Sequence, residues 1–490
     1  MEEKRPSGRD KMQQRPLRGL ALFTVLSLVI AACGGGGTAT PATSDTAPSV
    51  PGGSQPAGSP DASAPSGEFA PSGDIFAFGV NRAEADEIAT ERIEYFEELY
   101  PDVSLNVSES GFTAEGFLAS LASDDPPDVV RMDRNLIPTY VARDTLMPLD
   151  ECFERSGFDP SLYYEPTISE VTVDDQIYAV PEAMDTRNWL VNTAAFEEAG
   201  LDVDDFDFSD WDAIRSANDA LLAREGDALT RIGIDPKIPE FVALWAKANG
   251  VDLVSADGRT SQLEDPAVAE AVQFTVDLIN AQGGRDPFLG FRGTWDFFGA
   301  DNQFATDQVG AHPMEQWYLN VLTDSPEAPI TVKPFMDREG NPITLQGGSG
   351  LAITDVAPNP DAACAFVTAM AATEAWTRAA EERARLSEEE GGINTGTFPA
   401  NSEANEMIFS DIVDVEALPE TFRGAVEAVL ANQENAFSYP PSPANVTIFF
   451  GDTSIVATAV ARVLDGEDAA TVLAEADTEA QAAIDQALGQ

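Results

Sequence analysis

The 490-residue chain predicts an α/β fold divided into at least two lobes. From Asp74 onwards, short apolar runs typical of strands alternate with segments whose apolar residues recur at helical spacing. Strands and helices that alternate in this way form βαβ units with a mainly parallel sheet. The stretch from Gly73 to Gln490 is also longer than one hydrophobic core supports. We therefore expect two or more α/β lobes.

The first elements after the N-terminal region follow one another at βαβ spacing. They are a strand over 74–80, a helix over 84–100 that Pro101 ends, a strand over 103–107, a helix over 114–122 and a strand over 128–130. Ligands of such sheets bind in the loops beyond the carboxyl ends of the strands. The loops at 81–83 and 131–135 are therefore the first places to expect a binding site.

The N-terminus predicts export from the cell. Six basic residues precede an apolar run over 19–32, which is the pattern of a secretory signal peptide and is shorter than a transmembrane helix of about 20 residues. Its end, Ile30-Ala31-Ala32-Cys33, resembles the lipobox of bacterial lipoproteins, which implies cleavage before Cys33 and a lipid on this residue. The alternative is a cysteine that happens to follow an ordinary signal peptide. We expect a protein anchored by lipid to the outer face of the bacterial cytoplasmic membrane.

Residues 33–72 consist almost entirely of Gly, Ser, Pro, Thr, Ala and Asp. Such a segment has too little apolar surface to offset the entropy of ordering, so we expect a disordered linker. As a flexible coil it would have a mean reach of roughly 30 Å.

The chain is strongly acidic, with 84 acidic and 28 basic residues and a net charge of −56. Nucleic acid and anionic membrane surfaces are poor partners for it, because both require clustered positive charge. A cationic ligand and a solvated surface adapted to high salt are the two interpretations. The even distribution of Asp and Glu along the chain favours the second.

Two cysteines, Cys152 and Cys364, remain after Cys33. In an exported protein an even pair is compatible with a disulfide, and two separate buried thiols are the alternative. No motif for a metal site or a cofactor is present, so we expect neither.

Several segments, in order, resemble the extracellular solute-binding proteins of ABC importers, in the class of maltose-binding protein. They are 96–103 (FEELYPDV), 127–130 (PDVV), 177–181 (IYAVP), 189–201 (WLVNTAAFEEAGL), 310–317 (GAHPMEQW) and 347–353 (GGSGLAI). The resemblance spans Asp74 to the C-terminus. It rests on the order and spacing of the segments.

The resemblance implies a two-lobed, type II periplasmic-binding-protein-like fold whose hinge consists of several crossing segments. The implied boundaries are 73–183 plus 345–398 for the first lobe and 184–344 plus 399–490 for the second, with crossings near Glu182, Thr344 and Pro399. Cys152 and Cys364 would then share the first lobe, which favours their pairing. The implied partners are a small solute, expected to be a saccharide, and the transmembrane subunits of a permease, with the binding protein itself a monomer.

Sugar recognition uses flat aromatic faces and planar polar groups that bond hydroxyls. Trp317 follows a loop that would expose it, although a core position is the alternative. Asp185 matches a hinge carboxylate of the family, counted from Pro181, and Arg187 either joins it at the ligand or forms a structural ion pair with it. Trp295 would line the same cleft unless it serves packing.

The remaining expected ligand contacts come from four further segments. They are Asn81 and Arg82 after the first strand, Asp133 and Arg134 after the third, Glu240 and Phe241 at the start of a helix, and Tyr439 and Phe449 near the C-terminus. The chain lacks the Trp that maltose-binding protein has before the Asp-Arg pair, which puts maltodextrin itself in doubt.

We expect a binding protein rather than an enzyme. A secreted glycosidase would need a pair of carboxylates. With 84 acidic residues in the chain such a pair is expected by chance, so its presence does not indicate a glycosidase. Serine hydrolysis would need a histidine, of which there is one, and Gly347-Gly348-Ser349-Gly350-Leu351 lacks the final glycine of G-x-S-x-G. The other alternative is a non-sugar solute such as a polyamine or another cation.

Overall fold

The computed structural model describes residues 69–82, 86–108 and 111–489. The predicted signal peptide, Cys33 and most of the predicted linker lie outside these residues. Within them, no helix is long and apolar enough to cross a membrane.

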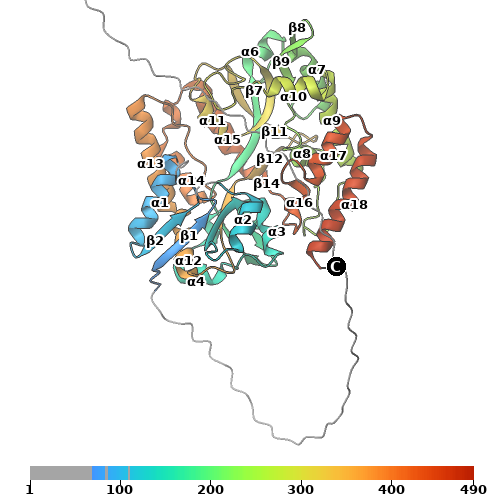
Figure 1. Ribbon diagram of the computed structural model, residues 1–490. Helices are drawn as coiled ribbons and strands as arrows, with labels where there is room; N and C mark the ends of the chain where they lie inside the picture. The colour runs from blue at the N-terminus through green and yellow to red at the C-terminus, as the bar shows by residue number, and fades with distance from the viewer. Residues whose placement is uncertain (1–68, 83–85, 109–110, 490) are drawn as a thin grey trace, which may run out of the picture. The chain divides into compact units, whose positions relative to one another are not determined.

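Two β-sheets organise the described chain, one in each of two α/β lobes (Figure 1). The first sheet has the order β2-β1-β3-β13-β6, with β1 Gly73–Phe78, β2 Val103–Val107, β3 Val129–Asp133, β6 Ala179–Pro181 and β13 Ser349–Ile353. The second has the order β14-β12-β11-β7-β10-β9-β8, with β7 Asp185–Asn192, β8 Ala223–Glu225, β9 Ala228–Ile234, β10 Val309–Glu315, β11 Ile330–Met336, β12 Pro342–Gly347 and β14 Ala436–Phe437. A separate hairpin joins β4 Thr172–Val173 and β5 Gln176–Ile177.

The helices near the first sheet are α1 Glu87–Leu99, α2 Ala114–Leu121, α3 Ile137–Val141, α4 Asp150–Ser156, α5 Glu165–Ser169, α12 Pro360–Met370, α13 Thr373–Glu390 and α14 Ser402–Met407. Those near the second are α6 Thr193–Glu198, α7 Trp211–Leu221, α8 Val242–Ala248, α9 Pro266–Ala281, α10 Arg285–Arg292, α11 Tyr318–Leu322, α15 Glu420–Asn432, α16 Asn445–Phe449, α17 Ile455–Leu464 and α18 Ala469–Ala487.

The local rules that predict the first elements hold in the structure. The strand over 103–107 is found at the expected residues, and α1 and α2 lie within the expected helical ranges. Asp86 caps α1 by accepting a hydrogen bond from the backbone N–H of Ala89, and Thr113 caps α2 through Gly116. The buried side chains of α1 include Ile93 and Phe96, which meet the core of the first lobe.

The expectation of a mainly parallel sheet is confirmed for the first three strands, and among the described strands parallel pairing recurs only between β9 and β10 and between β12 and β14. β1 pairs in parallel with β2 and β3, whereas β13 pairs antiparallel with β3 and β6. In the second sheet, β7 is antiparallel to β10, β11 and β12. The strands that run between the lobes enter each sheet from the hinge side, so βαβ geometry does not govern their direction.

The two sheets meet where the chain passes between them. β6 ends at Pro181 and β7 begins at Asp185, while β12 ends at Gly347 and β13 begins at Ser349. A third segment lies beside the first crossing, because Ala183 forms an antiparallel bridge with Pro399. Beyond Pro399 the chain first adds α14, whose Ala404 packs in one apolar cluster with Ile88 and Trp376 of the first lobe.

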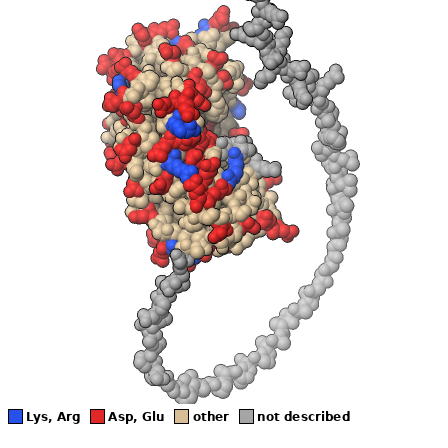
Figure 2. All heavy atoms as spheres, turned by 90° about the vertical axis from the view of Figure 1, so that its left-hand side faces the viewer, with Lys and Arg blue, Asp and Glu red and all other residues tan. Residues whose placement is uncertain are grey.

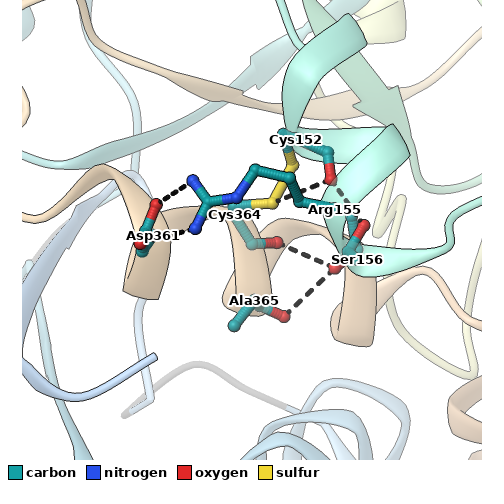
Figure 3. Close-up of a disulfide and its surroundings, with 7 residues drawn as sticks. Cys152, Arg155, Ser156, Asp361, Cys364 and Ala365 are labelled. Carbon is teal, nitrogen blue, oxygen red and sulfur yellow. Dashed lines mark hydrogen bonds and ion pairs between the residues drawn. A yellow bond between two sulfur atoms is a disulfide. The ribbon is translucent and has the colours of Figure 1, made fainter. Parts of the chain in front are cut away.

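A disulfide links α4 to α12 in the first lobe (Figure 3). Cys152 and Cys364 are bonded with their Cα atoms 5.6 Å apart. One turn along each helix, Arg155 and Asp361 form a two-pronged ion pair with N–O distances of 2.5 and 2.8 Å. Two elements that lie 212 residues apart in the sequence are therefore joined covalently and electrostatically.

The acidic side chains are largely on the surface. Figure 2 shows Asp and Glu spread over one face among uncharged residues, with a few Lys and Arg grouped near its middle. This distribution fits the predicted solvated surface.

Candidate functional site

A cavity of about 310 Å³ lies at the hinge between the two sheets. We call it the hinge cavity. Its charged lining consists of Arg131, Asp133, Glu170, Asp185, Arg187 and Glu315, and its other lining residues are Asn135, Gln346, Gly347, Gly348, Ser349 and Tyr439. Nearly all of these present carboxylate, guanidinium, amide or hydroxyl groups, so the cavity is suited to a ligand with many hydrogen-bonding groups.

β3 supplies the floor from the first lobe. Alternate side chains of a strand share a face, so Arg131 and Asp133 both point to the cavity side and are exposed there. The next residue, Arg134, lies on the other side. Its side chain is fully buried and donates to Glu170, Gln346 and three backbone carbonyls.

β7 supplies the opposite wall by the same alternation. Asp185 accepts a hydrogen bond of 3.1 Å from Gln316 Nε2, and Arg187 Nη2 lies 3.3 Å from Glu315 Oε1. Glu315 reaches this position because β10 pairs with β7 in a register that sets it opposite Arg187. A Cβ at Gly347 would lie 2.7 Å from Arg187 Nη1, so any larger residue here would displace the Arg187 guanidinium.

A buried ion triad holds Arg131 in place. Glu182, which is 2% exposed, accepts hydrogen bonds of 2.6 Å from Arg92 Nη2 and from Arg131 Nε, and Ser349 Oγ lies 2.9 Å from it. Burial by itself would raise the pKa of Glu182, but the guanidiniums of Arg131 and Arg92 outweigh it and lower the pKa to about 2. The carboxylate therefore stays ionised, and Arg131 keeps its orientation toward the cavity.

Desolvation has the opposite effect on three other carboxyl groups of the cavity. It raises the pKa of Asp133, Glu170 and Asp185, although nearby arginines offset part of the effect. Burial also raises the pKa of Tyr439 to about 12, so its hydroxyl is a neutral donor and acceptor.

Three buried polar atoms of the hinge cavity have no hydrogen-bond partner among the described residues. They are Oδ1 of Asn135, Oε1 of Glu170 and Nε of Arg187. A buried polar atom without a partner costs about 1–3 kcal/mol, so a site with three of them favours a ligand that supplies both donors and acceptors.

The structure brings four of the expected site residues together in the hinge cavity: Asp133, Asp185, Arg187 and Tyr439. Asn81 lines a neighbouring cavity of about 310 Å³ in the first lobe, which also reaches Arg131 and Glu182. Glu240 and Phe449 line a third cavity, on the second lobe, together with Tyr439.

The other expected residues lie outside these cavities. Arg82 is exposed and pairs with Glu97, and Phe241 is buried with its ring 5.5 Å from the Arg187 guanidinium. Trp295 packs at the edge of the core beside the His312 ring. Trp317 is half-buried, and its ring stacks 6.1 Å from the exposed Phe298 ring.

Sequence reasoning placed Arg131 and Asn135 in an expected binding segment without naming them as ligand contacts, and it missed Glu170, Glu315 and Gln346. A signal existed for Arg131, because it stands two residues before Asp133 on one strand. Glu170, Glu315 and Gln346 carry no comparable signal, since strand register and lobe packing bring them to the site.

The family of bacterial extracellular solute-binding proteins matches residues 91–387. The chain belongs to this family. No curated protein matches the sequence of this solute-binding protein. As a member of this family, the protein acts outside the cytoplasm.

Solved structures share the fold at low sequence identity. An ABC substrate-binding protein of Listeria monocytogenes, solved with cycloalternan, has a TM-score of 0.67 at 18% identity over 85% of this chain and 99% of its own. The GacH receptor of Streptomyces glaucescens, described in unliganded form and with acarbose, has a TM-score of 0.63 at 19% identity over 84% and 98%. UgpB of Mycobacterium tuberculosis, solved with glycerophosphocholine, has a TM-score of 0.64 at 20% identity over 85% and 100%.

Proposed function

We propose that this solute-binding protein captures a sugar or oligosaccharide in the hinge cavity and delivers it to the permease of an ABC importer. The observation that carries the proposal is the lining of this cavity by planar polar groups, three of whose buried atoms have no partner. A hydroxyl both donates and accepts, so the hydroxyls of a sugar can pair with the carboxylates and with the guanidiniums that line the cavity.

The mechanism follows from the position of the cavity. Its walls come from β3 of the first lobe and β7 of the second, so a ligand that bonds both walls favours the closed arrangement by its higher affinity for that state. In this proposal the protein acts by binding the solute and catalyses no reaction. A lipid on Cys33 and a flexible linker over 33–72 would keep it near the permease.

The named ligands of the structural neighbours support this choice of solute. Cycloalternan and acarbose are bound by two of them, and glycerophosphocholine by a third. A polyamine is the alternative ligand, because four carboxyl groups line the cavity beside Arg131 and Arg187.

The test is a thermal-shift titration of the purified protein with a panel of sugars and a panel of polyamines. A ligand at about 100 times its Kd stabilises the fold by about 2.7 kcal/mol, which gives a visible shift in Tm. We expect a sugar to stabilise the protein, and Asp185→Asn to remove most of this shift. Asp205→Asn, an exposed position outside the cavities, is the matched control and should keep it.

Stabilisation by polyamines alone would contradict the proposal. Trp317→Ala forms a second arm of the same experiment. Trp317 lies outside the hinge cavity and stacks on the exposed Phe298, so a site confined to this cavity predicts an unchanged Kd with the fold retained. A weaker Kd would extend the site to Trp317 and Phe298.

A further inference from the structure

The cavity of the second lobe that Glu240, Phe449 and Tyr439 line has a volume of about 180 Å³ and shares Tyr439 with the hinge cavity. It lies between the start of α8 and the segment that holds α16 and α17. Its walls are chiefly apolar and close-packed, since Val242, Leu253 and Val456 are 2%, 4% and 5% exposed. We call it the apolar cavity.

Tyr439 separates the two cavities and lines both. Arg187, Glu170 and Glu315 of the hinge cavity act electrostatically on its phenol group. Its ring lies 4.9 Å from the ring of Phe449, which lines the apolar cavity. Tyr439 is therefore shared by the polar and the apolar cavity, and a ligand group that reaches this side chain from the hinge cavity lies next to the apolar cavity.

The few polar groups of the apolar cavity are already engaged or face solvent. Glu240 pairs with Arg292 at 3.3 Å, and Ser454 Oγ accepts the backbone N–H of Ala457 as the cap of α17. Asp452 is exposed. Among the residues that line this cavity, the planar polar groups are the exposed carboxylates of Glu240 and Asp452, so the cavity offers the hydroxyls of a sugar ring few partners away from solvent.

We propose, on the basis of the proposed function, that the ligand carries an apolar substituent, an aryl or short alkyl group, which occupies the apolar cavity while its polar part fills the hinge cavity. The size agrees, because an apolar protein cavity of about 150 Å³ accommodates benzene. The ligand class is then a glycoside with an apolar aglycone rather than a free sugar.

The experiment measures Kd by calorimetry for methyl and phenyl glycosides of common hexoses and pentoses, with the corresponding disaccharides as a third series. Each methylene-sized group that leaves water changes Kd by about fourfold. Part of this gain is lost because the phenyl group and the side chains around it lose conformational entropy on binding. A phenyl glycoside should therefore bind at least about tenfold more tightly than its methyl counterpart.

Ala457→Phe places a ring into the apolar cavity and should abolish this difference while the methyl glycoside keeps its Kd. Ala457→Leu is a smaller filling variant should the first fail to fold. Thr458→Phe, at the next and exposed position of the same helix, is the matched control and should retain the difference.

Equal Kd values for methyl and phenyl glycosides would overturn the inference and leave the proposed function standing. A disaccharide that gains as much as the phenyl glycoside, and loses the gain in Ala457→Phe, would show that the cavity holds a second sugar ring and would also overturn it. Binding of none of the three series would overturn the proposed function together with the inference.

Discussion

Glu182 provides the sharpest test of how the hinge is held together. Replacing it with Gln removes one negative charge from between Arg92 and Arg131, both of which remain beside the first crossing of the chain. Arg92 is 4% exposed, so its charge would be left buried without an ionic partner. We expect Glu182→Gln to destabilise the protein strongly at neutral pH.

Two routes give a similar magnitude. Removal of one member of a buried ion pair costs about 3–5 kcal/mol. Independently, a carboxyl whose pKa falls from 4.5 when unfolded to about 2 when folded contributes about 3 kcal/mol to the free energy of unfolding. Since the folded pKa is the lower one, this contribution is present above pH 4.5 and is lost as the pH falls toward 2.

The assay is urea unfolding of the wild-type and variant proteins between pH 7 and pH 3. The difference should be about 3 kcal/mol at pH 7 and should shrink below pH 4.5, where the wild-type protein loses the contribution of Glu182. Glu97→Gln is the matched control, because Glu97 pairs with Arg82 while 43% exposed and should cost roughly 0.5 kcal/mol. A loss below 1 kcal/mol in Glu182→Gln, or a difference that does not vary with pH, would refute the reasoning.

Two further predictions concern the whole fold. The disulfide between Cys152 and Cys364 closes a loop of 212 residues, so its reduction should lower the free energy of unfolding by about 5 kcal/mol in the chain-entropy model. Urea unfolding with and without reductant measures this difference, and an identical midpoint would contradict it. With a net charge of −56, the protein should gain in Tm when NaCl rises from 0.1 to 1 M, because the screening length falls from about 10 to about 3 Å. A Tm that falls, or one that rises equally in a neutral osmolyte, would contradict self-repulsion as the cause.

Much of the fold could be predicted from local patterns. Apolar spacing located α1, α2 and β2 because the periods of 3.6 and 2 are properties of the helix and the strand themselves. The mainly parallel arrangement does not extend to β7, β12 and β13 for a physical reason. These strands belong to segments that leave one sheet and enter the other, and no local pattern records the direction from which they enter.

The site was predicted less completely than the fold. Asp185 and Arg187 were both expected, and strand alternation sets them on one face of β7. At the end of β3, however, Asp133 lines the hinge cavity, while the next residue, Arg134, turns away and anchors the crossing instead. Arg131 lines the cavity together with Asp133, because residues two apart in a strand share a face.

The sequence by itself determined the order of the elements, the resemblance to solute-binding proteins and the excess of negative charge. It also limited the cysteines to one intramolecular pair or two thiols. Only the tertiary structure decided that Glu182 joins Arg92 and Arg131, that Glu315 faces Arg187, and that Tyr439 divides a polar cavity from an apolar one. Local structure depends on neighbours a few residues away, whereas each of these contacts joins residues tens to hundreds of positions apart. Sheet register and lobe packing alone bring such residues together.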